Sequence, residues 1–423
     1  MVVSSRYYCW MTPSLTSPVK SGVRVSEGPL TTHIASYRAK LENLGYKPAQ
    51  VIYHLRFFAK INLWLLRRKQ RLWWLNELKV GQFLTQLRNQ HPAGYRGARF
   101  GLRLLLSFLR DVGVVAPKSA AIASSPAERL ADKYRVFLKE ECGLDRATIY
   151  NYSRHIDQFL TEHFGTGPVE LRALGTSPIA AFVRRHAPRG GRGLAAQMAT
   201  GLRSFFRFAR LRGLTTLDLA AVVPAVASWE MSGPPKHLPT EAVQRVLNAC
   251  ERSTVRGKRD YAILLLLARL GLRAGEIVAL QLDDIDWGDG QLVIRSKKGD
   301  GWARLPLPID VGRALARYLK VRPPSPYRNV FVRGYAPYTP FVASGPISVL
   351  ARKAIEKAEV KSARTGAHVF RHSLATEMLR RGASLDEIGR VLRHRHPDST
   401  AIYAKVDLNA LRGLALPWPG GAR

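Results

Sequence analysis

The chain of 423 residues is poor in cysteine and in acidic side chains, and it has no long apolar run. Its cysteines, Cys9, Cys142 and Cys250, are isolated and odd in number, so they indicate a reducing compartment and predict no zinc site. The longest apolar stretch, residues 261–270, is interrupted by Arg269 and is too short to cross a bilayer. The first ten residues lack a basic region followed by an apolar core, so we expect no secretory signal, no membrane association and a cytoplasmic location.

Basic residues outnumber acidic ones by 66 to 31, which gives a formal net charge of +35. A field of this size favours a polyanionic partner, and nucleic acid is the obvious candidate. On charge alone, a basic protein of the ribosomal type remains the alternative. Before residue 118 the acidic residues are only Glu27, Glu42, Glu77 and Asp111. We therefore expect the first third of the chain to contact a DNA backbone, although a basic run can also be a solvated face.

Six side chains in the last third of the chain form the most specific pattern. They are Arg273, Lys298, His368, Arg371, His394 and Tyr403. A phosphodiester under attack gains negative charge on its non-bridging oxygens, which guanidinium groups stabilise through paired hydrogen bonds. A tyrosine that attacks the phosphorus becomes covalently bound to it. The set therefore indicates phosphodiester cleavage by a tyrosine.

The spacing of these residues adds specificity. The run Gly-Leu-Arg-Ala-Gly-Glu at 271–276 follows an apolar stretch, residues 262–267, that predicts a buried helix. His368 and Arg371 are three positions apart and therefore share a helical face. The run Leu-Arg-His that ends at His394 precedes the tyrosine by nine positions.

In order and interval these segments resemble the tyrosine recombinase, or phage-type integrase, family over residues 238–407. The signature of that family is an arginine box, a lysine on a β-hairpin, His-x-x-Arg, a Leu-Gly-His box and a nucleophilic tyrosine. The resemblance implies that Arg273 and Arg371 clamp the scissile phosphate and that His394 donates to it. It also implies that His368 accepts the phenolic proton or binds a phosphate oxygen, and that Tyr403 forms a 3′-phosphotyrosyl intermediate.

Lys298 is expected at a hairpin tip, where an ammonium can protonate the departing 5′ oxygen. Its neighbour Lys297 is the competing candidate, and we favour Lys298 because its interval to Pro306 matches the hairpin register of the family.

Glu276 should lie on the same helical face as Arg273 and orient a guanidinium or a histidine, with an exposed helix pair as the alternative. Arg393 stands where the family usually has glycine, and it could crowd the turn or add a phosphate contact.

We expect neither a metal nor another cofactor. Four histidines fall near the boxes, but no carboxylate or cysteine accompanies them at ligand spacing. His372 and His396 are therefore interpreted as structural or DNA-facing. No P-loop and no acidic metal triad is apparent in the sequence, so the chemistry should require neither ATP nor magnesium.

An internal repeat precedes the region of resemblance. The run Gly101-Leu102-Arg103 returns as Gly201-Leu202-Arg203, and both copies have helical periodicity and close at a glycine. Two tandem helical domains are the simplest account, with proline-marked linkers between the units. The predicted segments are an N-terminal extension at 1–29, a first helical domain at 30–116, a core-binding domain at 127–222, a catalytic domain at 238–407 and a C-terminal tail at 408–423.

The predicted fold is mainly α. Two tandem helical, SAM-like DNA-binding domains are expected before the catalytic domain, and the resemblance implies that the second of them is the core-binding domain. The first domain is interpreted as a second DNA clamp, with a dimerisation or scaffold domain as the alternative. Residues 291–295 and 304–307 have strand patterns around a turn at 298–301, so the catalytic domain should be mixed α/β with a small antiparallel sheet.

These features predict a site-specific DNA recombinase or integrase of a bacterial mobile element, associated with the nucleoid. The resemblance implies a homotetramer on two synapsed double-stranded DNA sites, with sister recombinases as further candidate partners. A type IB topoisomerase with the same chemistry is one alternative. A non-catalytic DNA-binding protein on the same scaffold is the other, and the intact set of six residues argues against it.

Overall fold

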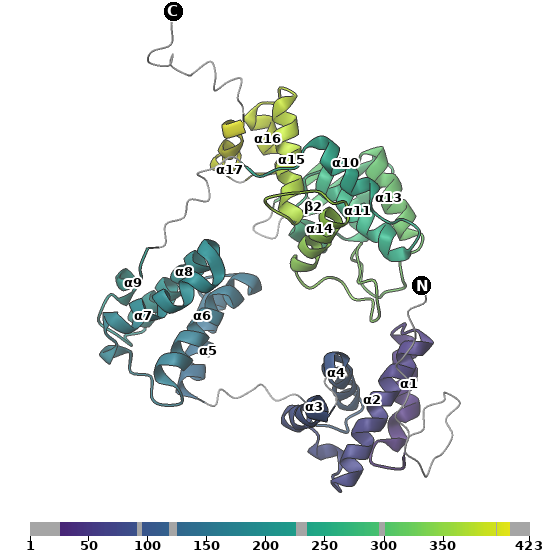
Figure 1. Ribbon diagram of the computed structural model, residues 1–423, viewed down its shortest axis with the longest axis vertical. Coiled ribbons are helices and arrows are strands. Elements are labelled where there is room, and N and C mark those ends of the chain that lie inside the picture. Colours follow the sequence, from purple (N-terminus) through teal and green to yellow (C-terminus); the bar gives the residue numbers. More distant parts are fainter. Residues whose placement is uncertain are drawn as a thin grey trace, which may run out of the picture. The chain divides into compact units, whose positions relative to one another are not determined.

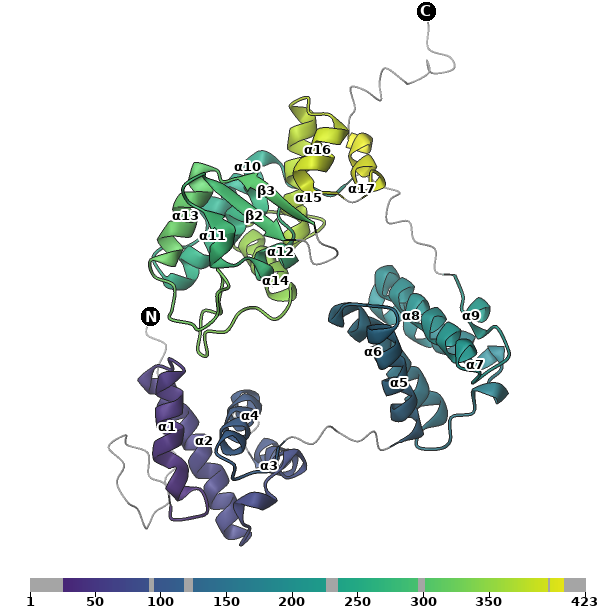
Figure 2. The same ribbon diagram turned by 180° about the vertical axis from the view of Figure 1, so that it is seen from behind.

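The computed structural model describes residues 26–90, 95–117, 125–225, 235–295, 301–394 and 396–406. They form two compact units, one made of the described residues between 118 and 233 and the other of those before 118 and after 233. Helices dominate both units (Figures 1 and 2). A small sheet lies in the unit that contains the residues after 233. The predicted mainly α fold with a small antiparallel sheet is therefore confirmed.

The first helical region is built around α2 (Pro48–Arg67), which begins with a proline where the missing backbone N–H removes no helical hydrogen bond. The buried apolar side chains of α2 lie in one core with those of the neighbouring helices. The other elements of the region are η1 (Thr31–His33), α1 (Ile34–Asn43), η2 (Leu72–Trp74), α3 (Glu77–Gln90) and α4 (Tyr95–Asp111).

The second helical region has an apolar core of its own. Its first two helices, α5 (Pro126–Glu140) and α6 (Arg146–Phe164), begin at Ser125 and Asp145, whose side chains accept hydrogen bonds from backbone N–H groups three residues later. The remaining elements are η4 (Leu171–Ala173), α7 (Thr176–His186), η5 (Ala187–Gly190), α8 (Gly191–Leu211) and α9 (Leu219–Val222).

The internal repeat has a structural basis. In α4 and α8, Gly101 and Gly201 lie where an added Cβ would approach an atom of α2 or α6 to 3.4 and 3.3 Å respectively. Both helices are followed by a glycine in the left-handed region, Gly113 at φ +73 and Gly213 at φ +67. The repeated glycines therefore permit close helix packing in the middle of each copy, and the left-handed glycines terminate helices α4 and α8.

The C-terminal region, residues 235–406, is arranged around α11 (Val255–Arg269). Residues 262–267 of this helix are all buried, as the sequence predicts. Because this stretch is apolar on every side, it lies in the interior. The helices packed against it include α10 (Thr240–Asn248), α13 (Ile309–Leu319) and α15 (Ala367–Arg380).

The sheet has three antiparallel strands in the order β1 (Ile285–Asp286), β2 (Gln291–Arg295) and β3 (Trp302–Pro306). In its register Gln291 lies opposite Pro306. The strand β2 has the predicted bounds, β3 begins two residues before the predicted 304–307, and β1 was not predicted. The first residues of the expected turn lie outside the described part of the chain.

The C-terminal region has a second, smaller apolar core, which is formed by Ala375, Ile388, Leu392 and Tyr403. The helices α15, α16 and α17 that surround it lie together in both views (Figures 1 and 2). The elements not yet named are α12 (Ala274–Ala279), η6 (Leu282–Asp284), α14 (Gly345–Lys357), α16 (Leu385–Leu392), α17 (Asp398–Ala401) and η7 (Ile402–Val406). Among the described residues, none of the helices has the length and apolarity needed to span a membrane.

Candidate active site

A sharp turn after α11 places Arg273. Gly271 has a φ of +55, and a Cβ added there would lie 2.7 Å from Leu392 Cδ2. Glycine is therefore needed both for the backbone conformation and for the close approach. Arg273 follows as the N-cap of α12, with φ −72 and ψ 146. The turn thus brings the arginine beside the segment that carries His394.

The carboxylate of Glu276 binds two arginines. Its Oε1 accepts a hydrogen bond from Arg273 Nη1 at 2.9 Å, and its Oε2 accepts from the Arg273 backbone N–H at 2.8 Å and from Arg393 Nη2 at 3.0 Å. The predicted shared helical face of Glu276 and Arg273 is wrong, because Arg273 precedes the helix and the contact is a capping arrangement. Burial raises the pKa of the Glu276 carboxyl, but the Arg393 cation and the Arg273 hydrogen bonds outweigh burial and hold the pKa below its ordinary value.

Arg371 is buried in α15 and bonded to the backbone of two other segments. Its Nη1 donates to the Gly271 carbonyl at 2.6 Å, and its Nη2 donates to the Leu392 carbonyl. Burial, followed by the positive charges of Arg273 and Arg393, lowers the pKa of Arg371 to about 9. A bound phosphate would relieve this concentration of positive charge.

His368 lies one turn before Arg371 on α15, as the sequence predicts, and its side chain is exposed. Partial desolvation, followed by the charges of Arg371 and Arg273, lowers the pKa of His368. The ring is therefore predominantly neutral at neutral pH and can accept as well as donate a hydrogen bond.

His394 follows the end of α16, and its Nδ1 lies 2.6 Å from Thr400 Oγ1. Its ring is nearly parallel to that of Tyr403, with an angle of 5° and ring centroids 6.4 Å apart. Burial, followed by the charge of Arg371, lowers the pKa of His394 to about 4. The contact with Thr400 uses one ring nitrogen, which leaves Nε2 as the atom that could face a ligand.

Tyr403 lies in η7 and is 1% exposed. Its Oη is 2.9 Å from Nδ1 of His372, a residue that the sequence did not place in the site. One signal was present in the sequence, because His372 is four positions after His368 and therefore lies on the same helical face. Burial raises the pKa of Tyr403 to about 12, against the opposing effect of Arg371.

The segment 392–394 joins these groups. Arg371 donates to the carbonyl of Leu392, and Arg273 Nη2 donates to that of Arg393 at 3.1 Å. His394 comes next in the chain and faces the Tyr403 ring. Two guanidinium groups, an imidazole and the phenol therefore meet at one place.

Lys297 and Lys298 lie outside the described residues. The strands that flank them, β2 and β3, end at Arg295 and begin at Trp302. Their assignment therefore stays a prediction. Within the described part of the chain, no group of three or more His, Cys, Asp or Glu side chains is arranged to hold a metal ion.

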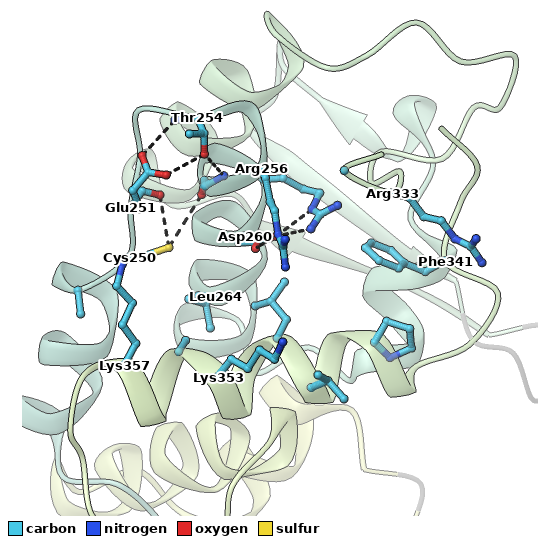
Figure 3. Close-up of a pocket in the computed structure, with 18 of the residues that line it drawn as sticks. Cys250, Glu251, Thr254, Arg256, Asp260, Leu264, Arg333, Phe341, Lys353 and Lys357 are labelled. Carbon is cyan, nitrogen blue, oxygen red and sulfur yellow. Dashed lines mark hydrogen bonds and ion pairs between the residues drawn. The ribbon is translucent and has the colours of Figure 1, made fainter. Parts of the chain in front are cut away.

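A cavity of about 860 Å³ opens elsewhere in the C-terminal region, between α11 and α14 (Figure 3). Its walls include Arg256, Phe341 and Lys353, and none of the expected catalytic residues appears among its described lining. The cavity reaches the first turn of α11, whereas Arg273 follows the last turn of that helix. The 15 residues of α11 span about 22 Å, so this end of the cavity is well separated from the catalytic groups.

Comparison with known proteins agrees with this geometry. Residues 236–409 match the phage integrase family. Over 402 residues, which cover 95% of the chain and 97% of the relative, the sequence is 41% identical to the putative integrase/recombinase y4rA of Sinorhizobium fredii. The chain belongs to the tyrosine recombinase family.

A second relative of the chain is the tyrosine recombinase XerD of Listeria monocytogenes. The two are 30% identical over 285 residues, which cover 66% of the chain and 94% of XerD. The fold is similar to that of the XerH site-specific recombinase bound to a palindromic difH substrate, with a TM-score of 0.53 and 17% identity. That match covers 71% of the chain and 99% of XerH.

Proposed function

We propose that the chain is a site-specific DNA recombinase that cuts and rejoins double-stranded DNA through a 3′-phosphotyrosyl intermediate on Tyr403. The observation that carries this proposal is the meeting of Arg273, Arg371, His394 and Tyr403 around the segment 392–394. Membership of the tyrosine recombinase family supports site-specific recombination as the class of reaction.

In the cleavage step, Oη of Tyr403 attacks the scissile phosphorus and the bond to the 5′ oxygen breaks. The phenolic proton passes to a neighbouring imidazole, for which His372 is already within hydrogen-bond distance. Lys298, expected at the hairpin tip, gives a proton to the departing 5′ oxygen. Arg273 and Arg371 bind the non-bridging oxygens, where negative charge increases as the phosphorus is attacked.

In the rejoining step, a 5′ hydroxyl of a partner strand attacks the phosphotyrosine and releases Tyr403. The phosphotyrosine bond retains the energy needed to form the new phosphodiester, so no nucleotide cofactor is required. Exchange of both strands of two duplexes needs four nucleophiles, one for each strand, which favours a tetramer on two synapsed sites. We place this reaction on a bacterial mobile element in the nucleoid, with sister recombinases as candidate partners.

The test is a suicide substrate nicked beside the cleavage point, which traps the covalent adduct on a denaturing gel. The unaltered chain should form the adduct, and Tyr403→Phe should bind DNA equally well but form none. Tyr335→Phe, which alters an exposed tyrosine of the same region, is the matched control and should form the adduct normally. An adduct with Tyr403→Phe would assign the nucleophile elsewhere, and relaxation of plasmid DNA without strand exchange would favour a topoisomerase.

A further inference from the structure

Arg393 occupies a backbone position that favours glycine. It caps α16 with φ 55 and ψ 53, in the left-handed region. Among the described residues, only two other non-glycine residues have a positive φ, Lys69 and Glu359. A side chain at such a position is strained relative to glycine, and a favourable contact of that side chain can offset the strain.

The side chain of Arg393 makes that contact inside the candidate active site. Nη2 donates to Glu276 Oε2 at 3.0 Å, and Nη1 donates to the Val391 carbonyl at 2.9 Å. The side chain is 14% exposed, and its Nε is buried with no partner among the described residues. Both terminal nitrogens of the guanidinium are therefore bonded to protein groups. The phosphate contact expected from the sequence stays a prediction.

Arg393 reaches Arg273 by two routes. Its backbone carbonyl accepts a hydrogen bond from Arg273 Nη2 at 3.1 Å, and its side chain shares the carboxylate of Glu276 with Arg273 Nη1. The three residues form a closed ring of hydrogen bonds. Rotation of the Arg273 guanidinium away from this orientation would break at least two of them.

The ring also sets the local charge. Without Arg393, the ion pair of Arg273 and Glu276 would carry no net charge and would attract a phosphate only weakly. A second guanidinium on the same carboxylate leaves one net positive charge in the group of three. A phosphate oxygen is therefore attracted to the outer edge of Arg273.

We propose that Arg393 is a positioning residue that holds Glu276 and thereby orients Arg273 toward the scissile phosphate. This inference rests on the proposed strand-cleavage function. It predicts that Arg393 contributes to the rate of cleavage through Arg273. Arg393 contributes little to DNA affinity, because the scissile phosphate is only one of the several phosphates that a DNA-binding protein contacts.

The test measures single-turnover cleavage of the nicked substrate at saturating protein, together with DNA affinity. Arg393→Gly removes the guanidinium while it suits the backbone, so the protein should fold and bind DNA normally. Loss of a charged hydrogen bond should slow adduct formation about tenfold or more. Arg393→Lys should recover part of the rate because it restores the positive charge. Arg390→Ala, which alters an exposed arginine of the same helix, is the control and should cleave normally.

A double-mutant cycle separates positioning from direct action. If Arg393 acts through Arg273, then Arg393→Gly added to Arg273→Lys should slow cleavage no further than Arg273→Lys alone. Multiplicative losses in the double variant, or normal cleavage by Arg393→Gly, would overturn the positioning role. Absence of an adduct with the unaltered chain would instead overturn the proposed function, and this inference with it.

Discussion

Nδ1 of His372 lies 2.9 Å from Oη of Tyr403, although 31 positions separate the two residues in the chain. Burial, followed by the nearby His368, lowers the pKa of His372 to about 4, so its ring is neutral at neutral pH and can accept the phenolic hydrogen bond. Burial raises the pKa of Tyr403 to about 12, which keeps the proton on the phenol. The nucleophile is thus held protonated in the free protein, and its proton can pass to the neighbouring imidazole only as the bond to phosphorus forms and makes the phenol more acidic.

His372→Phe should therefore slow formation of the covalent adduct by roughly tenfold to a hundredfold, in the range expected for loss of a general base. Phenylalanine retains the aromatic ring and should leave DNA affinity unchanged. The measurement is single-turnover cleavage of the nicked substrate, with His396→Gln at an exposed position as the control. Normal cleavage by His372→Phe, together with slow cleavage by His368→Phe, would assign the proton to His368.

Arg273→Lys and Arg371→Lys should both lose most of their cleavage activity while they retain DNA binding, because lysine keeps the charge but not the bidentate fork. Their stabilities should differ. Arg371 is 4% exposed and bonds two backbone carbonyls, so its replacement should destabilise the protein by about 1–3 kcal/mol. The Arg273 side chain is 39% exposed, and Arg273→Lys should have a smaller effect. Thermal unfolding of both variants checks the difference, and near-normal cleavage by both would remove these arginines from the site.

Gly271→Ala should destabilise the C-terminal region by about 1–3 kcal/mol, since the added methyl group would meet Leu392 and the backbone has a positive φ. Gly275→Ala is the matched control, because it lies four residues away in α12 and an added Cβ would meet nothing within 4 Å. Denaturant unfolding of the two variants gives the comparison. Equal stability of the two variants would show that the turn after α11 accommodates the added methyl group without a loss of folding free energy.

Lys298→Ala should cleave normally when the leaving group is a 5′ thiol, since a thiolate departs without a proton from the enzyme. With the ordinary 5′ oxygen, the same variant should cleave slowly. Lys297→Ala is the control that tests which of the two adjacent lysines is the general acid. If the thiol restores cleavage to Lys297→Ala and not to Lys298→Ala, the general acid is one residue earlier than predicted.

Local sequence patterns were sufficient for much of the fold. The apolar run at 262–267 predicts the buried helix α11, and the short apolar run with β-branched residues at 291–295 predicts β2, because both signals depend on residues close together in the chain. The strand β1 has only two residues, which is too few to produce a recognisable strand pattern. Its place in the sheet depends on pairing with β2.

The contacts within the site depend on residues far apart in the sequence. The capping role of Arg273 follows from a turn that Gly271 permits, whereas helical spacing suggested that Arg273 lay inside a helix. The bonds from Arg393 to Glu276 and from Tyr403 to His372 span 117 and 31 positions. No periodicity in the sequence encodes such tertiary contacts, so spacing could suggest which residues meet but not which atoms bond.

Deletion of residues 1–116 should weaken DNA binding and flatten its dependence on salt. The first helical region shares the glycines of the second at equivalent places, and acidic side chains are sparse in this part of the sequence. Each phosphate that the protein binds releases condensed counterions, so the log–log slope of affinity against salt should fall by about 0.9 for each phosphate that the truncated chain no longer binds. Affinity at several salt concentrations, for the full chain and the truncated one, provides the measurement.

The same deletion distinguishes a DNA clamp from a domain that joins protomers. Tyr403 and the groups that contact it all lie after residue 235, so a truncated chain that folds should still form the adduct on a nicked site. If the salt slope is unchanged and tetramers no longer assemble, the first helical region contacts other protomers and not DNA. Sedimentation of the full and truncated proteins on synapsed sites separates the two outcomes, because only removal of a clamp changes the slope while the tetramer remains.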